Sequence, residues 1–354
     1  MATLHVFRLQ PLGAFHIGGQ GIGLEATIER CPSDTLYAAL LVQAKLAGLP
    51  FPEPTPDGTL SDPPFRLSSC LPYAGDALLF PRPRLATLDR GGSAPGRRKR
   101  DKKIAYVSAT VLRQLLAGGT LDDCLPETGG AGQLYQDGTV LIADADGGPR
   151  GSDVIWSADR IDHVTVDRAR EASQYYAVGQ VRFAAGCGLF VLAETSTSAA
   201  HDLLLELLVR LGHSGLGGRR SAGLGQFEVA PPTTIALPNA GTDRALLLSR
   251  YLPTLDELRA DVLGPDAAYD LVRVGGWLQS ADPRVPAQQR KAIHLLAEGS
   301  IVQCPGQRPP RGGVADVGPD LPPDAAPWPH AIWRYGLALA IGVGGRSSYG
   351  DLPA

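Results

Sequence analysis

The feature that most constrains this sequence is the segment 212–225, in which six positions are glycine. The leucine spacing of residues 201–211 before it is typical of a helix, and residues 226–229 after it can continue as a strand. Glycine-dense backbone disfavours regular elements, because glycine loses more conformational freedom on folding than any other residue. The segment therefore predicts a loop between a helix and a strand, where the backbone can come close to a ligand.

This loop also carries two adjacent arginines, Arg219 and Arg220. Glycine N–H groups can point at phosphate oxygens, and arginine can pair with phosphate through two parallel hydrogen bonds. The triplet Gly-Gly-Arg at 217–219 recurs at 344–346, which favours contact with an RNA backbone over a plain surface loop. The candidate RNA-binding residues of the two loops are Gly217, Gly218, Arg219, Arg220 and Ser221, and Gly344, Gly345, Arg346 and Ser347.

Neither glycine loop has the signature of a nucleotide-binding enzyme. The chain contains no Gly-Lys dipeptide, which a phosphate-binding P-loop requires, and the glycines at 215, 217 and 218 do not have the spacing GxGxxG. The cysteines lie far apart without a CxxC pair, so the sequence predicts neither a zinc cluster nor a disulfide framework. We therefore expect no cofactor and no metal.

The charge of the chain limits how it can bind nucleic acid. Its formal net charge is −3, so any contact with RNA must be made by a local group of cations. Six of the seven residues at 97–103 are Lys or Arg, and Arg97 and Arg98 are therefore candidates for RNA contact, with simple solvated charge as the alternative. No apolar run approaches the roughly 18 residues of a membrane span, and no export signal is recognisable. We expect a cytoplasmic protein without membrane contact.

One histidine has a position that suggests catalysis. His16 follows the first predicted strand and precedes a glycine-dense turn at 18–23. A ribonuclease that uses a histidine as general base also needs a second proton-transfer group or a cation nearby, and the sequence places none in register. We therefore expect no catalytic residue, with an endoribonuclease that uses His16 as the alternative.

The order of elements predicts two α+β domains. In the first, the elements are expected at residues 4–12 (strand), 34–47 (helix), 163–168 (strand), 180–194 (strand) and 201–211 (helix). Asp34 has the short acceptor side chain of a helix cap. Residues from about 85 to 160 lack this organisation and are interpreted as an insertion or a long projecting hairpin. We expect βαββαβ-type domains at residues 1–230, including the insertion, and at residues 240–354.

Several motifs together resemble one family of CRISPR proteins. Phe15-His16-Ile17-Gly18, followed by Ser33-Asp34-Thr35-Leu36, is similar to the opening of the RAMP proteins, and most similar to the fourth subunit of the type III-A Csm complex. The likeness continues at 71–73, 164–168 and 290–300, and in both glycine loops. By matched position it implies that His16, Gly18 and Ser33 bind RNA along with the loop residues.

The resemblance also implies an architecture and a role. It implies two ferredoxin-like (RRM-like) domains with a thumb projecting from the first. Such subunits cap the repeat-derived 5′ tag of the guide RNA (crRNA) and join the large polymerase-like subunit to the backbone RAMP subunits. Their thumb meets the target RNA and interrupts its pairing with the guide, and they cut nothing themselves. The equivalent cap subunit of a type III-B complex is a further alternative.

Overall fold

The structure is a computed structural model that describes residues 1–19, 24–55, 58, 60, 63–85, 95–167, 172–278, 288–320 and 331–344. The first half contains β1 (Ala2–Pro11), α1 (Ser33–Ala47), β2 (Phe65–Leu67), β3 (Leu71–Ala74), β4 (Ala77–Pro81), α3 (Pro95–Lys103), β5 (Tyr106–Ser108), α4 (Ala109–Leu116), β6 (Gly132–Tyr135), β7 (Val140–Ala143), β8 (Trp156–Asp167), β9 (Ala172–Phe183), β10 (Cys187–Thr195), α5 (Ser198–Ser214), β11 (Phe227–Val229) and β12 (Thr233–Leu237).

The second half contains β13 (Arg244–Leu247), α6 (Leu255–Arg259), β14 (Leu271–Val274), β15 (Trp277–Leu278), β16 (Gln288–Gln289), β17 (Ile293–Leu296), β18 (Ile301–Gln303), β19 (Gly312–Asp316), β20 (Trp333–Leu337) and β21 (Ala340–Gly342). Single 3₁₀ turns lie at Asp122–Cys124, Pro126–Thr128, Gln136–Gly138, Asp144–Asp146, Arg220–Ala222 and Pro305–Gln307. None of the helices in these described stretches is long and apolar enough to cross a membrane.

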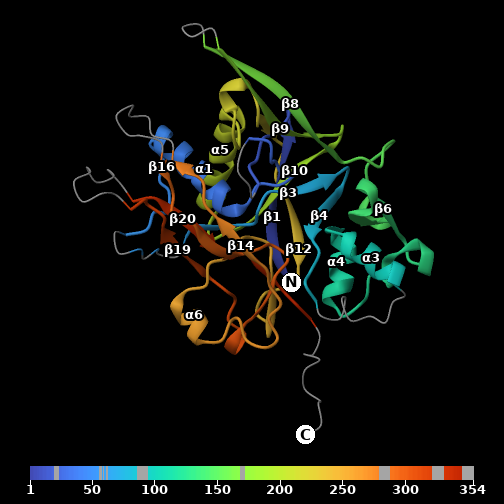
Figure 1. Cartoon of the computed structure of the whole chain (residues 1–354). Helices are drawn as coiled ribbons and strands as arrows, with labels where there is room; N and C mark the ends of the chain where they lie inside the picture. Colours follow the sequence, from blue (N-terminus) through green and yellow to red (C-terminus); the bar gives the residue numbers. More distant parts are fainter. Residues whose placement is uncertain are drawn as a thin grey trace.

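A ten-stranded sheet forms the frame of the first half (Figure 1). Its order is β11-β1-β10-β3-β4-β5-β7-β6, and β12 pairs with β1 and β2 with β10. The strands β11, β1, β10 and β3 are antiparallel neighbours, with α1 inserted after β1 and α5 after β10. This connectivity is that of a βαββαβ unit, and the predicted α+β fold is confirmed.

Both faces of this sheet are buried, as the near-continuous apolar run of β10 requires. Along β1, Phe7 and Leu9 pack under α1 and α5, whereas Leu4 and Val6 point to the opposite face. That opposite face packs against α4 and against β13, β18 and β21 of the second half. The two halves therefore share a core, since successive side chains of one strand serve both layers.

The second half is less regular than a βαββαβ unit. Its three-stranded sheet has the order β18-β13-β21, and four further strands form the two-stranded pairs β14-β17 and β15-β16. A βαββαβ unit has its second helix before its last strand. At that position, between β18 and β21, the described residues contain the β19-β20 hairpin instead. The domain boundaries at 1–230 and 240–354 remain a prediction.

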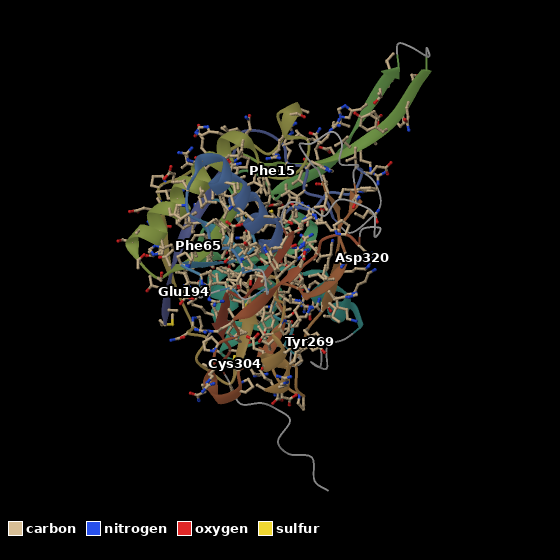
Figure 2. The ribbon with its side chains drawn as sticks, turned by 90° about the vertical axis from the view of Figure 1, so that its left-hand side faces the viewer. Phe15, Phe65, Glu194, Tyr269, Cys304 and Asp320 are labelled. Carbon is tan, nitrogen blue, oxygen red and sulfur yellow. The ribbon has the colours of Figure 1, made fainter. Side chains whose placement is uncertain are left out.

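One hairpin projects far from the body of the protein. Strands β8 and β9 pair continuously from Trp156–Phe183 to Asp167–Ala172 and extend beyond the helices (Figures 1 and 2). Residues 95–155, most of the predicted insertion, instead extend the sheet through β5, β7 and β6. The predicted single strand 180–194 is the end of β9 and all of β10, separated by a turn at Gly186 with φ of +73°.

Candidate nucleic-acid interface

His16 joins the glycine loop to the base of the projecting hairpin. His16 is 5% exposed, and its Nδ1 lies 2.7 Å from the carbonyl oxygen of Gly179 in β9. Nδ1 is the donor in this hydrogen bond, because a carbonyl oxygen can only accept. The His16 carbonyl in turn accepts from the Gly218 N–H at 2.8 Å. The neighbouring residue Phe15 forms a β-bridge with Val181 of the same strand. His16 therefore contacts both structures that surround it and is held in one ring orientation.

Close packing on His16 explains two of the loop glycines. A Cβ on Gly217 would lie 2.5 Å from the His16 carbonyl oxygen, and Gly217 also has φ of +96°, which disfavours any other residue. A Cβ on Gly218 would lie 2.7 Å from Cδ2 of the His16 ring. Glycine is thus required here by close contacts within the protein, whereas the sequence pattern predicted glycine for a close approach of the backbone to RNA.

Arg219 is turned toward the hairpin. Its Nη2 donates to the Tyr176 hydroxyl at 2.8 Å, and its guanidinium carbon lies 5.3 Å from the centre of the Tyr176 ring. Tyr176 stacks on His163 of the paired strand, with ring centroids 5.3 Å apart. The next residues, Arg220 and Ser221, are exposed on a 3₁₀ turn. The arginine pair therefore has divided roles, one side chain packed on the hairpin and the other directed to solvent.

Gly18 completes this region of the surface. It is exposed, it forms a β-bridge with Thr27, and no atom of the described residues lies within 4 Å of the place a Cβ would occupy. Its φ is not positive, so neither conformation nor internal packing requires glycine. We use the term glycine-loop surface for Gly18, Gly217, Gly218, Arg219, Arg220 and Ser221, which the structure brings together around His16.

Ser33 does not belong to this surface, and its proposed role in binding RNA is wrong. It is 1% exposed, its hydroxyl accepts from the N–H of Arg250 at 3.0 Å, and its own N–H donates to Ser69 Oγ at 2.9 Å. A hydroxyl buried in contacts between the two halves cannot reach a phosphate.

The predicted helix cap at Asp34 is also wrong. The residue that precedes α1 is Pro32, and no side chain caps the helix. Asp34 is fully buried and accepts from Arg250 Nη1 at 3.3 Å and from Arg334 Nη1 at 2.7 Å. Its carboxylate serves an ion-pair network between the halves, which sequence spacing could not reveal because the partners lie more than 200 positions away.

The remaining predicted residues lie elsewhere. Arg97 and Arg98 are part of α3, whose Arg100 pairs with Asp122 and Glu127, on a side of the molecule remote from α5 (Figure 1). Gly344 lies beside the end of α4, where its Cβ would be 3.1 Å from the Leu116 carbonyl oxygen. Gly345, Arg346 and Ser347 lie outside the described residues.

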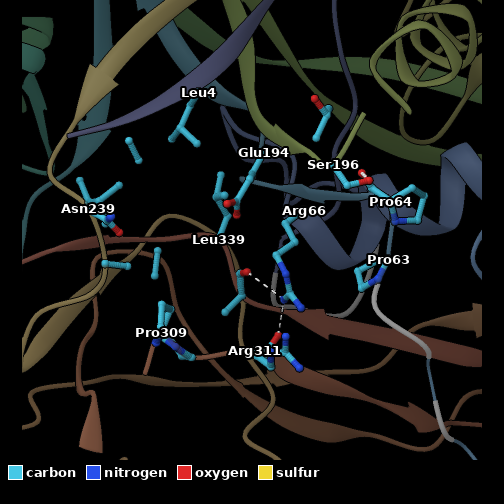
Figure 3. Close-up of a pocket in the computed structure, with 17 residues that line it drawn as sticks. Leu4, Pro63, Pro64, Arg66, Glu194, Ser196, Asn239, Pro309, Arg311 and Leu339 are labelled. Carbon is cyan, nitrogen blue, oxygen red and sulfur yellow. Dashed lines mark hydrogen bonds between the residues drawn. The ribbon is translucent and has the colours of Figure 1, made fainter. Parts of the chain in front are cut away.

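A cavity of about 340 Å³ lies where the two halves meet (Figure 3). Arg66 spans it, donating to the carbonyl oxygens of Arg311 at 2.7 Å and Ala338 at 3.4 Å. Four prolines are part of its lining, and none of the sequence-predicted site residues lines it. Among the described residues, no group of three or more His, Cys, Asp or Glu side chains could hold a metal ion.

Comparison with known proteins identifies the family. A family model described as the CRISPR Csm4 C-terminal domain matches residues 240–343. The CRISPR system Cms protein Csm4 of Mycobacterium tuberculosis (strain ATCC 25618 / H37Rv) is 31% identical over 306 residues, which cover 85% of this chain and 88% of that protein. The chain belongs to the Csm4 family. Csm4 of Thermococcus onnurineus (strain NA1) is 25% identical over 278 residues, covering 78% of this chain and 80% of that protein.

Solved structures of Csm4-containing assemblies share the fold. A chain of the Csm3-Csm4 subcomplex in the type III-A CRISPR-Cas interference complex matches with a TM-score of 0.59 at 16% identity, covering 97% of this chain and 100% of that chain. A chain of the Csm1-Csm4 cassette in complex with AMPPNP matches with a TM-score of 0.53 at 17% identity, covering 98% of this chain and 100% of that chain. The resemblance to the RAMP proteins of the Csm complex is confirmed.

Proposed function

We propose that this chain caps the repeat-derived 5′ tag of the crRNA in a type III-A effector complex, without cutting RNA. The observation that carries the proposal is the glycine-loop surface, which adjoins β9 through His16 and Arg219 and in which Gly18, Arg220 and Ser221 are exposed. Exposed backbone, a guanidinium and a hydroxyl are groups that bind RNA phosphates and 2′-hydroxyls.

We propose that β8–β9 is the thumb that interrupts pairing between guide and target. Val164, Val166 and Tyr175 are 59%, 63% and 64% exposed, and strand pairing places all three on one face of the hairpin. Apolar side chains presented in this way can insert between stacked bases. Target RNA would therefore contact this face.

The proposed partners follow from the relatives. Structures with this fold are described as a Csm3-Csm4 subcomplex and as Csm1-Csm4 cassettes. We propose that this chain likewise joins a large polymerase-like subunit to the backbone RAMP subunits in the cytoplasm. A type III-B cap subunit would differ in the large subunit with which it co-purifies.

The proposed absence of catalysis rests on His16. The residue is only 5% exposed, which limits the access of RNA to its ring, and its bonds to Gly179 and Gly218 give it a role in positioning the loop. A metal-free cleavage assay on repeat RNA tests this. Specific cleavage by the wild type that His16→Ala abolishes would establish the endoribonuclease alternative.

The capping role is tested by co-expressing the tagged chain with its candidate large subunit and a CRISPR array. RNA that survives a high-salt wash is then sequenced. Guides that share one repeat-derived 5′ end are the expected result. In Gly18→Ala, where the added methyl meets no atom of the described residues, we expect a wild-type melting temperature but reduced guide content. Guides with random 5′ ends, or no guides, would contradict the capping role.

A further inference from the structure

A second exposed surface lies on the β14–β17 and β15–β16 strands of the second half. Trp277 is 62% exposed at the start of β15. The two residues before it, Gly275 and Gly276, are exposed as well, and Gly276 has φ of +125° with no atom of the described residues within 4 Å of where a Cβ would lie. A large aromatic ring therefore stands next to uncovered backbone.

The strands that carry Trp277 are cationic. The described residues 271–278 and 288–296 include Arg273, Arg290 and Lys291 but no Asp or Glu, and Lys291 is paired with Asp320 outside these strands. Trp277 pairs with Gln289 across the ribbon, so its neighbours are polar. A ring close to cations is typical of single-stranded nucleic-acid sites, where bases stack on aromatic side chains in a positively charged groove.

The side chains of a buried arginine, Arg334, and a partly buried one, Arg290, contact the backbone around the glycine pair. Arg334, which is 4% exposed, donates from Nη2 to the Gly275 carbonyl oxygen at 3.0 Å. Arg290 donates from its backbone N–H to Gly276 at 2.9 Å and from Nη2 to the Trp277 carbonyl oxygen at 3.3 Å. The Nε atoms of both arginines are buried and have no hydrogen-bond partner in the described part of the chain.

Positive charge is in excess at this place. Arg250 and Arg334 share the carboxylate of Asp34, Arg250 also lies 3.9 Å from Glu298, and Arg290 is close enough to Arg334 to feel its charge, so three guanidinium groups face two carboxylates. Burial, followed by the charge of Arg334, lowers the pKa of Arg290, and the charge of Asp34 opposes this effect only in part. A bound anion would offset the excess, and Gly275–Gly276, without side chains, leaves room for one.

We propose that Trp277 stacks on one base of single-stranded RNA while Arg290 and the Gly275–Gly276 backbone hold an adjacent phosphate. The inference deepens the proposed function, on which it rests, by adding a nucleotide site in the second half. Because Trp277 pairs with Gln289, its ring and the Arg290 side chain leave opposite faces of the ribbon. The exposed glycine pair is the edge over which an RNA backbone passes between these faces.

Photo-crosslinking tests the site. The full chain is irradiated with a short fluorescein-labelled single-stranded RNA that carries 5-iodouridine at successive positions, and the crosslinked residue is identified by mass spectrometry. We expect a crosslink at Trp277. Trp277→Ala should weaken binding of the same RNA about tenfold to a hundredfold, whereas Trp277→Phe, which retains a ring, should stay within about threefold of the wild type. Melting temperatures confirm that both variants fold.

The controls separate this inference from the proposed function. If Arg220→Ala weakens binding but Trp277→Ala does not, the tag-capping proposal stands and the Trp277 site is wrong. If the wild type binds no RNA, both are wrong. If Trp277→Ala leaves RNA binding unchanged but prevents co-purification of the large subunit, the surface docks a protein and the nucleotide assignment is overturned.

Discussion

Asp34 and Arg334 are 300 positions apart in the chain, yet carboxylate Oδ2 and guanidinium Nη1 lie 2.7 Å apart in the buried junction of the two halves. Arg250 Nη1 binds the other oxygen of the same carboxylate at 3.3 Å. One side chain in the first turn of α1 therefore ties the first half to two separate segments of the second half.

Removal of the Asp34 charge should destabilise the protein strongly. Asp34→Asn leaves Arg334 buried without its counter-charge and Arg250 with Glu298 alone, which costs about 3 to 5 kcal/mol of the free energy of unfolding. Urea denaturation measures the change. Asp202→Asn is the matched control, because that side chain is 77% exposed. The free energy of unfolding of this variant should stay within about 0.5 kcal/mol of the wild type. Equal effects of the two substitutions would show that the ion pairs are not what joins the halves.

Gly217 and Gly223 should respond differently to the same substitution. Both have positive φ, +96° and +81°, but only a Cβ on Gly217 meets another atom, the His16 carbonyl oxygen. Gly223→Ala should therefore cost about 1 kcal/mol through backbone strain alone. Gly217→Ala should cost about 2 to 4 kcal/mol because the loop must also move off His16. Comparable melting temperatures for the two variants would argue against close packing of the loop on His16.

The adjacent arginines should have separable effects. Arg220→Ala removes an exposed cation, so guide retention should fall by about 1 to 3 kcal/mol of binding free energy while thermal stability is unchanged. Arg219→Ala removes the contact with Tyr176, so the part of the hairpin around Tyr176 should also gain protease sensitivity. Limited proteolysis and RNA content of the purified complex measure the two effects. Protease sensitivity that rises in Arg220→Ala instead would reverse these assignments.

Glu257 should make stability depend on acid pH. Burial acts to raise its pKa, but N–H donors from Thr254, Arg311 and Gly312 hold the carboxylate and lower the pKa below the ordinary value for a glutamate overall. Because the folded pKa is the lower one, this stabilisation is complete above about pH 5 and is lost as pH falls through the folded pKa.

Glu257→Gln should therefore lower the free energy of unfolding by about 1 kcal/mol at pH 7, the usual value of a helix cap, and by less at pH 3. Urea titrations at the two pH values check this. Asp256→Asn is the control, since its side chain is 92% exposed. A Glu257→Gln deficit that is the same at both pH values would mean that the carboxylate charge contributes nothing.

The sequence by itself determined the local elements and the family. The glycine-rich segment 212–225, the helix before it and the strand after it follow from backbone entropy and hydrophobic spacing, which neighbouring residues fix. For the same reason Gly217, Gly218 and Arg219 could be singled out without a structure. The motif order that resembles the RAMP proteins is likewise a property of the sequence alone.

Tertiary structure decided what those residues touch. Ser33 and Asp34 have the residue types of an anion site and a helix cap, but packing of the second half buried both among arginines. The hairpin at 156–183 could not be located beforehand, because alternation predicts strands and not whether they pair with the sheet or with each other. Trp277 belongs to no sequence motif, and it is identified as a candidate site only by its exposure near Arg290 and two exposed glycines. Burial and charge balance depend on contacts between distant segments, which sequence spacing does not record.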